Sequence, residues 1–335
     1  MVRMVVGIAM TALCMSLIAM PVDASDFTLE IFGNANMDDK IDDMDIEYVQ
    51  GIIAGSNDKT DLADANYDGT VDEGDIAQIE LIIDGEEKVL TLEDRAGRVV
   101  TINIPVERII ALHYMEASVI RSLDANDYIV GVGDEITKAS TFFPELSQLP
   151  CVGKTWSPDP EAIISLEPDL VLFNAPIYGW GGPELVEAIT PANITVFFCD
   201  FSDPPFYTDE VKKLAYILGK TVEGDEFIEW YESYINIIGD ITRELSESDK
   251  LRVFDTHSNW GSYGKDEIGS NPMIQLAGGI NIAAGLPGSW ITVDPEWVIT
   301  ESPDIVILQS WDNDILVLRN ESYKFYYSPY NKDCV

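Results

Sequence analysis

Two acidic segments of this 335-residue chain carry oxygen-bearing side chains at the same intervals, thirty residues apart. In residues 34–45 these side chains stand at positions one, three, five, nine and twelve, and residues 64–75 repeat the spacing. A calcium ion takes about six to eight oxygen ligands, and this spacing gathers them around one point, with a backbone carbonyl at position seven. We therefore predict two bound calcium ions. The predicted ligands are Asn34, Asn36, Asp38, Lys40 (carbonyl), Asp42 and Asp45, then Asp64, Asn66, Asp68, Thr70 (carbonyl), Asp72 and Asp75.

A short helix is predicted after each loop, because residues 46–53 and 76–83 carry apolar side chains at helical spacing. A duplicated loop and helix with Asp rather than Glu at position twelve resembles a dockerin, the calcium-dependent module that binds a cohesin domain on another protein. The resemblance covers about residues 31–85 and implies a cohesin-bearing partner. In dockerins the residues after the ninth ligand carry specificity. Here they differ, as Asp43-Met44 and Glu73-Gly74, so either half remains a candidate docking face.

The acidic residues are concentrated in the same part of the chain. The sequence has 20 Lys and Arg against 59 Asp and Glu, a net charge of −39, and residues 26–87 hold 19 of the acids with only two lysines. A body of this charge is repelled by nucleic acid, so we exclude a nucleic-acid partner. A solvated acidic surface is the alternative to cation binding, and the repeated spacing favours the cations. Asp39 occupies position six of the first loop, where glycine is usual, and strain is expected there.

The first 24 residues have the pattern of an export signal. Arg3 is followed by an apolar run, Met4–Pro21, and by Val22-Asp23-Ala24, a cleavage pattern of the small-x-Ala kind. We predict a signal peptide over residues 1–24 and an exported protein, located outside the cell, at the cell surface or in an equivalent of the periplasm. An uncleaved anchor is the alternative.

Residues 89–335 alternate strand-like and helical segments, which is typical of parallel sheets. The strand-like runs form two groups, separated by residues 209–247, where apolar side chains recur at helical spacing. The predicted fold class is therefore α/β, with lobe one at residues 89–208, a connecting helix at 209–247 and lobe two at 248–335. A small all-α unit with EF-hand-like calcium loops precedes the two lobes.

Two further signatures carry a second resemblance. The segment 152–172, including Pro158-Asp159-Pro160-Glu161, and the segment 270–307, including Trp290 and Pro295-Glu296-Trp297, are similar to the helical-backbone substrate-binding proteins of ABC importers. The resemblance spans about residues 89–311 and implies a two-lobed periplasmic-binding-protein-like fold with a single backbone helix. Members of this family receive iron-siderophores, haem, cobalamin and some bare metals. The resemblance thus implies a receptor for a metal chelate rather than an enzyme.

The same resemblance assigns two carboxylates to the contact with the importer. In the family, one Glu on each lobe docks onto arginines of the membrane permease, and the matching positions are Glu161 and Glu296. Each stands at the start of a predicted helix, where the helix dipole favours a negative charge. Two ordinary carboxylates of helix N-termini are the alternative.

The candidate ligand residues follow strands, since ligands of open α/β lobes bind at the carboxyl ends of the strands. The chain has only two histidines, one in each lobe, which could face each other and ligate a metal or haem iron, or could each hydrogen-bond a loop. The many aromatic side chains suit a large, flat chelate or a corrinoid. The predicted ligand-binding residues are His113, Tyr114, Glu135, Trp156, Tyr178, Trp180, His257, Trp260, Tyr263 and Trp290.

Three function classes follow from these observations. The leading one is an exported receptor for an iron-siderophore, haem or a corrinoid, tethered through a calcium-stabilised dockerin. The alternative is a surface-assembly protein in which the dockerin works and the receptor is degenerate, because lobe two looks shorter than in the family after residue 311. An enzyme such as a chelatase acting through His113 and His257 is the third class, and no nucleophile–base pair supports it.

Overall fold

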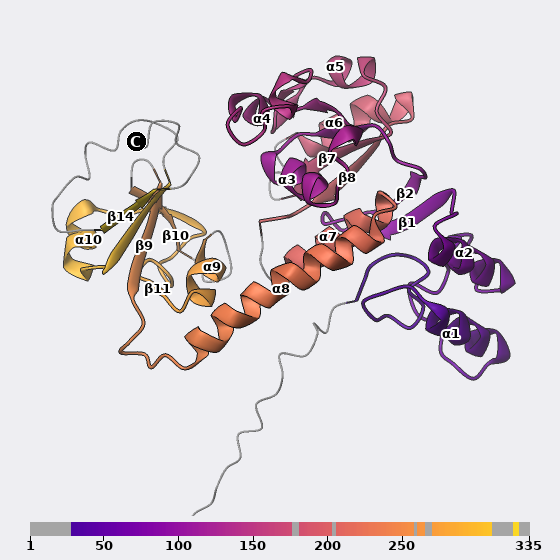
Figure 1. Ribbon diagram of the computed structural model, residues 1–335, viewed down its shortest axis with the longest axis horizontal. Helices are drawn as coiled ribbons and strands as arrows, with labels where there is room; N and C mark the ends of the chain where they lie inside the picture. Colours follow the sequence, from indigo (N-terminus) through magenta and orange to yellow (C-terminus); the bar gives the residue numbers. More distant parts are fainter. Residues whose placement is uncertain are drawn as a thin grey trace, which may run out of the picture.

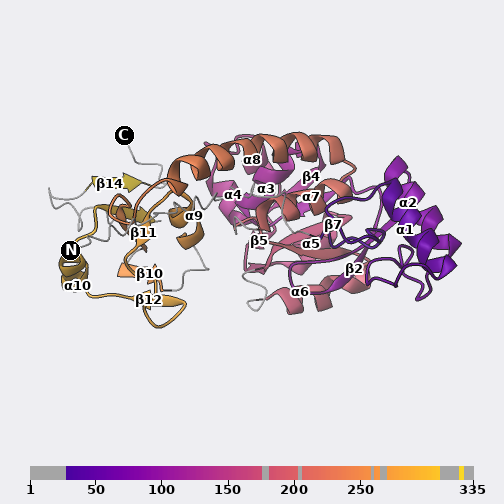
Figure 2. The same ribbon diagram turned by 90° about the horizontal axis from the view of Figure 1, so that it is seen from below.

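The computed structural model describes residues 28–175, 181–202, 206–257, 260–264, 270–309 and 324–327. Two α/β lobes lie at opposite ends of one long helix, and a small N-terminal unit lies beside the first lobe, away from the second (Figures 1 and 2). Each lobe contains a four-stranded sheet of parallel strands. The predicted α/β class and the two-lobed arrangement are confirmed. Among the described helices, none has the length and apolar character needed to span a bilayer.

The N-terminal unit contains two similar helices, α1 (Asp43–Ala54) and α2 (Glu73–Asp84). Both begin with a capping box, in which the side chain of the residue before the helix and the Asp three positions later satisfy free backbone N–H groups. Both end at a glycine in the left-handed region, Gly55 and Gly85, which a residue with a Cβ would adopt only with strain.

A hairpin of β1 (Val89–Glu93) and β2 (Val99–Asn103) joins this unit to lobe one. Ile31 of the N-terminal unit forms an antiparallel bridge with Leu92, and the amide of Phe32 donates to the carbonyl of Thr91 at 2.9 Å. The hairpin therefore gains a third backbone segment from the N-terminal unit (Figure 1).

Lobe one is built on a sheet with the strand order β4-β3-β7-β8. The strands are short apolar runs buried on both faces, as expected for a parallel sheet covered by helices. The elements of this lobe are β3 (Ile109–Ala111), α3 (Tyr114–Ser122), β4 (Ile129–Val132), α4 (Asp134–Lys138), β5 (Gly153–Lys154), β6 (Ser157–Pro158), α5 (Pro160–Ser165), β7 (Leu170–Asn174), α6 (Gly182–Ile189) and β8 (Thr195–Cys199), with 3-10 turns at Asn126–Tyr128, Leu146–Gln148 and Thr190–Ala192.

The connecting segment consists of two helices, α7 (Tyr207–Ile217) and α8 (Thr221–Arg243). The chain turns between them at Gly219, whose φ is +61°. Gly224 does not interrupt α8. A Cβ on Gly224 would lie 2.6 Å from the Cβ of Ala215, so glycine here permits the close packing of α8 against α7. Helix α8 then runs to lobe two (Figure 2).

Lobe two repeats the plan with the strand order β11-β9-β13-β14. A two-stranded antiparallel ribbon, β10 and β12, follows the carboxyl end of the central strand β9. The elements are β9 (Arg252–His257), β10 (Gly261–Tyr263), α9 (Asn271–Leu276), β11 (Ile280–Asn281), β12 (Trp290–Thr292), α10 (Pro295–Glu301), β13 (Ile305–Gln309) and β14 (Lys324–Tyr327).

Candidate ligand cleft and calcium loops

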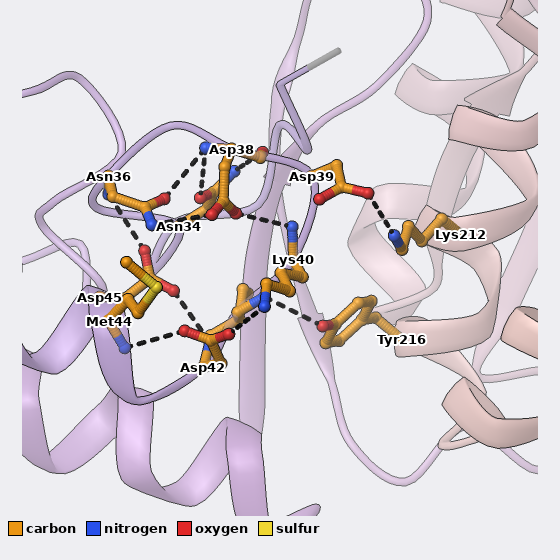
Figure 3. Close-up of polar contacts among 11 residues, drawn as sticks. Asn34, Asn36, Asp38, Asp39, Lys40, Asp42, Met44, Asp45, Lys212 and Tyr216 are labelled. Carbon is orange, nitrogen blue, oxygen red and sulfur yellow. Dashed lines mark hydrogen bonds and ion pairs between the residues drawn. The ribbon is translucent and has the colours of Figure 1, made fainter. Parts of the chain in front are cut away.

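The two acidic loops, loop one (residues 34–45) and loop two (residues 64–75), fold through the same hydrogen bonds. In each, the Asp at position twelve accepts from the amides of positions three and nine, at 3.0 and 2.8 Å for Asp45 and at 3.1 and 2.8 Å for Asp75. The side chains at positions one and five accept further loop amides, as Figure 3 shows for loop one. These bonds turn the oxygen side chains of each loop inward.

The donor set of these loops fits a hard cation. The side chains of Asn34, Asp45 and Asp75 are fully buried, and no described Lys or Arg forms an ion pair with either of the two carboxylates. Burial raises the pKa of Asp45 to about 6, with Asp38 and Asp42 adding repulsion, and burial also raises the pKa of Asp75. A buried carboxylate without a counter-ion is costly, and an oxygen-coordinated cation would offset that cost. Among the described residues, no three His, Cys, Asp or Glu side chains lie close enough together to hold a metal ion by themselves. Amide and carbonyl oxygens would therefore have to complete the ligand set of each loop.

Loop one departs from loop two in two respects. The expected strain at Asp39 is wrong, since the left-handed residue of loop one is Met37, at position four, as Tyr67 is in loop two. Gly69 is also left-handed, with φ of +97°, and Asp39 is not. The ammonium of Lys40 lies 2.5 Å from the carboxylate of Asp42, so loop one already holds one positive charge beside a predicted ligand.

In lobe one, His113 and Glu135 lie together at the carboxyl ends of β3 and β4. His113 caps α3: its Nδ1 accepts from the amide of Met115 at 3.4 Å, which leaves Nε2 3.4 Å from Oε2 of Glu135. The ring of Tyr114 lies 4.1 Å from that of His113, centroid to centroid. Behind them the fully buried Glu116 accepts the amides of Leu112 and His113 at 2.7 and 2.9 Å. The structure thus brings together three predicted ligand residues, His113, Tyr114 and Glu135.

The electrostatics of this cluster keep His113 neutral. Burial lowers the pKa of His113 to about 4, while burial raises the pKa of Glu135, with a further contribution from Asp134. Burial also holds the pKa of Glu116 well above its usual range. Oε2 of Glu135 and Oε1 of Glu116 are buried without a hydrogen-bond partner. Because Nδ1 accepts an amide, Nε2 of the neutral imidazole carries the proton, so the cluster presents an imidazole donor and an under-satisfied carboxyl to a polar ligand.

Acid is expected to weaken the fold through His113. The pKa of His113 is lower in the folded protein than its unfolded value of about 6.5, so the folded state binds the proton less readily than the unfolded state. The protein therefore has its full stability above pH 6.5 and loses stability as the pH falls towards 4. Between pH 7 and 5 the loss is about 2 kcal/mol. Urea unfolding of the native protein and of His113→Asn, which keeps a capping acceptor, measures it. Parallel pH profiles for the two proteins would contradict the assignment.

In lobe two, His257, Tyr263 and Trp290 form an aromatic cluster at the carboxyl end of β9. The ring of His257 lies 4.9 Å from Trp290 and 5.7 Å from Tyr263, both edge to face, and Tyr263 and Trp290 are 5.2 Å apart. Tyr263 and Trp290 are paired across the β10–β12 ribbon. Burial lowers the pKa of His257, and its Nε2 is buried without a hydrogen-bond partner. The cluster offers a neutral imidazole nitrogen framed by two rings.

Gly261 sets the position of Trp290 in this cluster. A Cβ on Gly261 would lie 2.3 Å from Cζ2 of Trp290, so the indole rests directly on the glycine backbone. The indole nevertheless keeps 51% of its surface exposed, which leaves a broad apolar face for a ligand. No sequence signal distinguished this glycine, because the contact depends on the pairing of β10 with β12.

The remaining predicted ligand residues are placed differently. Trp156 follows β5 and is 44% exposed, whereas Trp260 packs against the lobe-two core around Phe254 and does not join the His257 cluster. Tyr178 and Trp180 lie outside the described residues. Within the described part of the chain, every ring contact of His113 and His257 stays within its own lobe. A cavity of about 400 Å³ lies elsewhere, between α8 and α9, and contains none of the predicted ligand residues.

Glu161 and Glu296 occupy equivalent places in the two lobes. Each follows an Asp-Pro pair, and the Asp, at 159 or 294, caps the helix by accepting the amide of the Glu at 3.0 or 2.7 Å. Proline at the first helical position fixes the backbone for α5 and α10. Both glutamates are exposed, so each lobe presents one carboxylate at a rigid helix start.

Both helices are also held at their far ends by one repeated contact. In lobe one, Asp169 accepts the amide of Arg108 at 2.9 Å, while the Arg108 guanidinium donates to the carbonyls of residues 166 and 167. In lobe two, Asp304 accepts the amide of Arg252 at 2.8 Å, and the Arg252 guanidinium binds the carbonyl of Glu301 at 2.9 Å. These arginines were not predicted as functional, although Asp169 and Asp304 each stand eight residues after a glutamate that the sequence predicts to dock.

Two α/β lobes on one helix, with imidazole and aromatic groups at the strand ends, are the architecture of a two-lobed binding protein. The sequence profile of the periplasmic binding protein family matches residues 109–324, so the chain belongs to this family. The chain is 23% identical over 255 residues to the molybdate-binding protein MolA of Haemophilus influenzae, covering 69% of this chain and 71% of MolA. It is 22% identical over 192 residues to a vitamin B12-binding protein of Yersinia pestis, covering 56% and 66%.

Solved structures share the fold. The structure of MolA bound to molybdate superposes with a TM-score of 0.57 at 22% identity, covering 65% of this chain and 73% of MolA. The haem-binding protein HutB of Vibrio cholerae gives a TM-score of 0.51 at 20% identity, covering 60% of this chain and 75% of HutB. All three relatives are named for the solute that they bind.

Proposed function

We propose that this protein is an exported receptor that binds a metal chelate between its lobes and delivers it to an ABC importer. The His257–Tyr263–Trp290 cluster carries the proposal. The Trp290 and Tyr263 rings, inclined at 63° and 81° to the imidazole, suit a large conjugated ligand, and Nε2, which has no hydrogen-bond partner, would ligate the metal centre of that ligand. Haem and corrinoids have this chemistry, and the named functions of HutB and the vitamin B12-binding relative agree with it.

The charge of the lobe-one cluster disfavours a bare oxyanion such as the molybdate of MolA. The polar groups around His113 are the carboxyls of Glu116 and Glu135, and Lys138 on the same helix as Glu135 is already paired with Asp134. An anion would meet these carboxyls without a free cation from this cluster. A neutral or cationic chelate avoids that repulsion.

Tryptophan-fluorescence titration of the full chain with haem, cobalamin, a ferric siderophore and molybdate tests the proposal. We expect saturable quenching by one of the first three, and a loss of at least about tenfold in affinity for Trp290→Ala, since a buried aromatic anchor contributes roughly 2 kcal/mol. Trp230→Ala is the matched control, because Trp230 is 55% exposed on α8, outside the cluster. If only molybdate binds, the ligand is an oxyanion and the proposed metal chelate is wrong.

We further propose that loop one and loop two each hold a calcium ion and that the N-terminal unit serves as a dockerin-like tether to a cohesin-bearing protein. The duplicated donor sets and the buried, unpaired Asp45 and Asp75 support the ions. Exposed apolar side chains on α1 and α2, including Met44 at 59% and Ile53 at 42%, support a protein partner. Equilibrium dialysis with calcium should give two bound ions per chain. If no calcium binds, this part of the proposal is wrong.

A further inference from the structure

Helix α7 of the connecting segment contacts the N-terminal unit through three polar side chains, and two of them reach loop one. Lys212 reaches Asp39 at 3.1 Å, and the hydroxyl of Tyr216, one turn further, accepts the amide of Ile41 at 3.2 Å. Asp39 and Ile41 flank Lys40, whose carbonyl is a predicted calcium ligand. Figure 3 shows both α7 side chains pointing at this part of the loop.

The third side chain, Lys213, is buried at the junction of three segments. Its Nζ binds Glu30 of the N-terminal unit at 2.5 Å, the carbonyl of Glu93 in the hairpin at 3.2 Å, and Glu210 of α7 at 3.3 Å. Only 1% of Lys213 is exposed, and Glu210 is equally buried. The buried ammonium therefore ties the N-terminal unit to the lobe, although its partner Glu30 keeps 45% of its side chain exposed.

Apolar packing continues across the same boundary. One buried cluster contains Ile31, Ile41 and Val49 of the N-terminal unit together with Leu92 of the hairpin and Leu214 of α7. Ile41 thus belongs to loop one and to the core of lobe one at the same time. Loop two also packs into this cluster, through Ala65 and Val71, but among the described residues none of α7 forms a hydrogen bond or ion pair with residues 64–75.

We propose that loop one is a calcium-dependent clasp on lobe one. This inference rests on the proposed calcium sites and adds that the two ions have unequal effects on the stability of lobe one. A cation in loop one would fix the backbone between Asp38 and Asp42. Lys212 and Tyr216 bind the same stretch, through Asp39 and the amide of Ile41. Calcium in loop one therefore stabilises α7 and the core of lobe one against which α7 packs, whereas calcium in loop two, which has no polar contact with α7, acts mainly on the N-terminal unit. The coupling is reciprocal, so an intact grip also tightens calcium binding.

The position of the tryptophans allows a direct test. All seven lie at residue 156 or later, so tryptophan fluorescence follows the receptor domain and contains no signal from the N-terminal unit. Thermal unfolding of the full chain is recorded by this fluorescence with calcium in hundredfold excess over its dissociation constant and with a chelator. We expect calcium to raise the midpoint by about 5–10 °C.

Matched variants assign this shift to loop one. Asp38→Ala and Asp68→Ala remove the same ligand position from the two loops, and we expect the first to abolish most of the shift and the second to retain most of it. Lys212→Met with Tyr216→Phe leaves every predicted ligand in place and is expected to reduce the shift by about half or more, with calcium affinity lowered severalfold. Equilibrium dialysis measures the calcium bound by each variant.

Two outcomes would overturn the clasp and leave the calcium sites standing. One is two bound ions with no shift of the unfolding midpoint in the native protein. The other is an equal loss of the shift in Asp38→Ala and Asp68→Ala. Absence of calcium binding would overturn both.

Discussion

Reversing Glu161 and Glu296 together to lysine is expected to reduce ligand uptake to background while ligand affinity changes less than about twofold. Each carboxylate stands exposed at a helix start that is fixed by an Asp cap and a proline, so neither reversal disturbs a buried contact. If the partner surface on the permease is basic, each reversal replaces an attraction by a repulsion that costs several kcal/mol. Uptake of labelled ligand by cells that carry the cognate importer measures the effect.

The control for this experiment must change the charge by the same amount. Glu184 on α6 and Glu229 on α8 are also exposed, and their double reversal to lysine raises the net charge equally without touching α5 or α10. That variant should take up ligand normally. If Glu161→Lys/Glu296→Lys transports as well as this control, the two glutamates do not dock.

Replacing Lys213 by methionine is expected to destabilise the protein by about 3–5 kcal/mol, the usual cost of leaving one partner of a buried ion pair without its counter-ion. Glu210, 1% exposed, would lose the ammonium that lies 3.3 Å from it, and the carbonyl of Glu93 would lose a donor. Burial already raises the pKa of Glu210, against the opposing effect of Lys213. Urea unfolding followed by tryptophan fluorescence gives the change in free energy.

Lys212→Met is the matched control, since it removes the same charge one residue earlier. Its partner Asp39 has 45% of its side chain exposed, and such a pair contributes less than about 1 kcal/mol. Adding Glu210→Leu to Lys213→Met should recover part of the loss, because the uncompensated charge is then removed. Equal costs for the two lysines would show that burial of Lys213 has no special effect.

Local pattern was sufficient to predict the lobes. The strands of lobe one are continuous apolar runs, such as residues 170–173, and helix α8 follows from apolar residues at helical spacing. The Asp-Pro-Glu helix starts and the repeated acidic loops are also short motifs, in which neighbours in sequence are neighbours in space. Glu161 and Glu296 could therefore be predicted with their helices, although docking itself remains a proposal.

Contacts between distant segments could not be predicted in this way. Lys213 and Glu30 are 183 residues apart, and Tyr216 and Ile41 are 175 apart, so no periodicity relates them. Gly224 illustrates the same limit on a smaller scale. Glycine disfavours a helix interior, yet Gly224 lies within α8, where the close packing of α8 on Ala215 requires a residue without a Cβ. Burial of His113, which sets its pKa, likewise arises only once the lobe has assembled.

The bridge between Ile31 and Leu92 bears on whether the N-terminal unit could be exchanged as a separate module. A unit can be moved to another protein without loss of stability only if its neighbours do not depend on it. Here the hairpin of the receptor takes its third backbone segment, and part of its apolar cover, from residues before the join. Substitutions at Ile31 and Leu92 should consequently co-vary among homologues that carry both parts, and homologues without the N-terminal unit should have a more polar residue where this chain has Leu92.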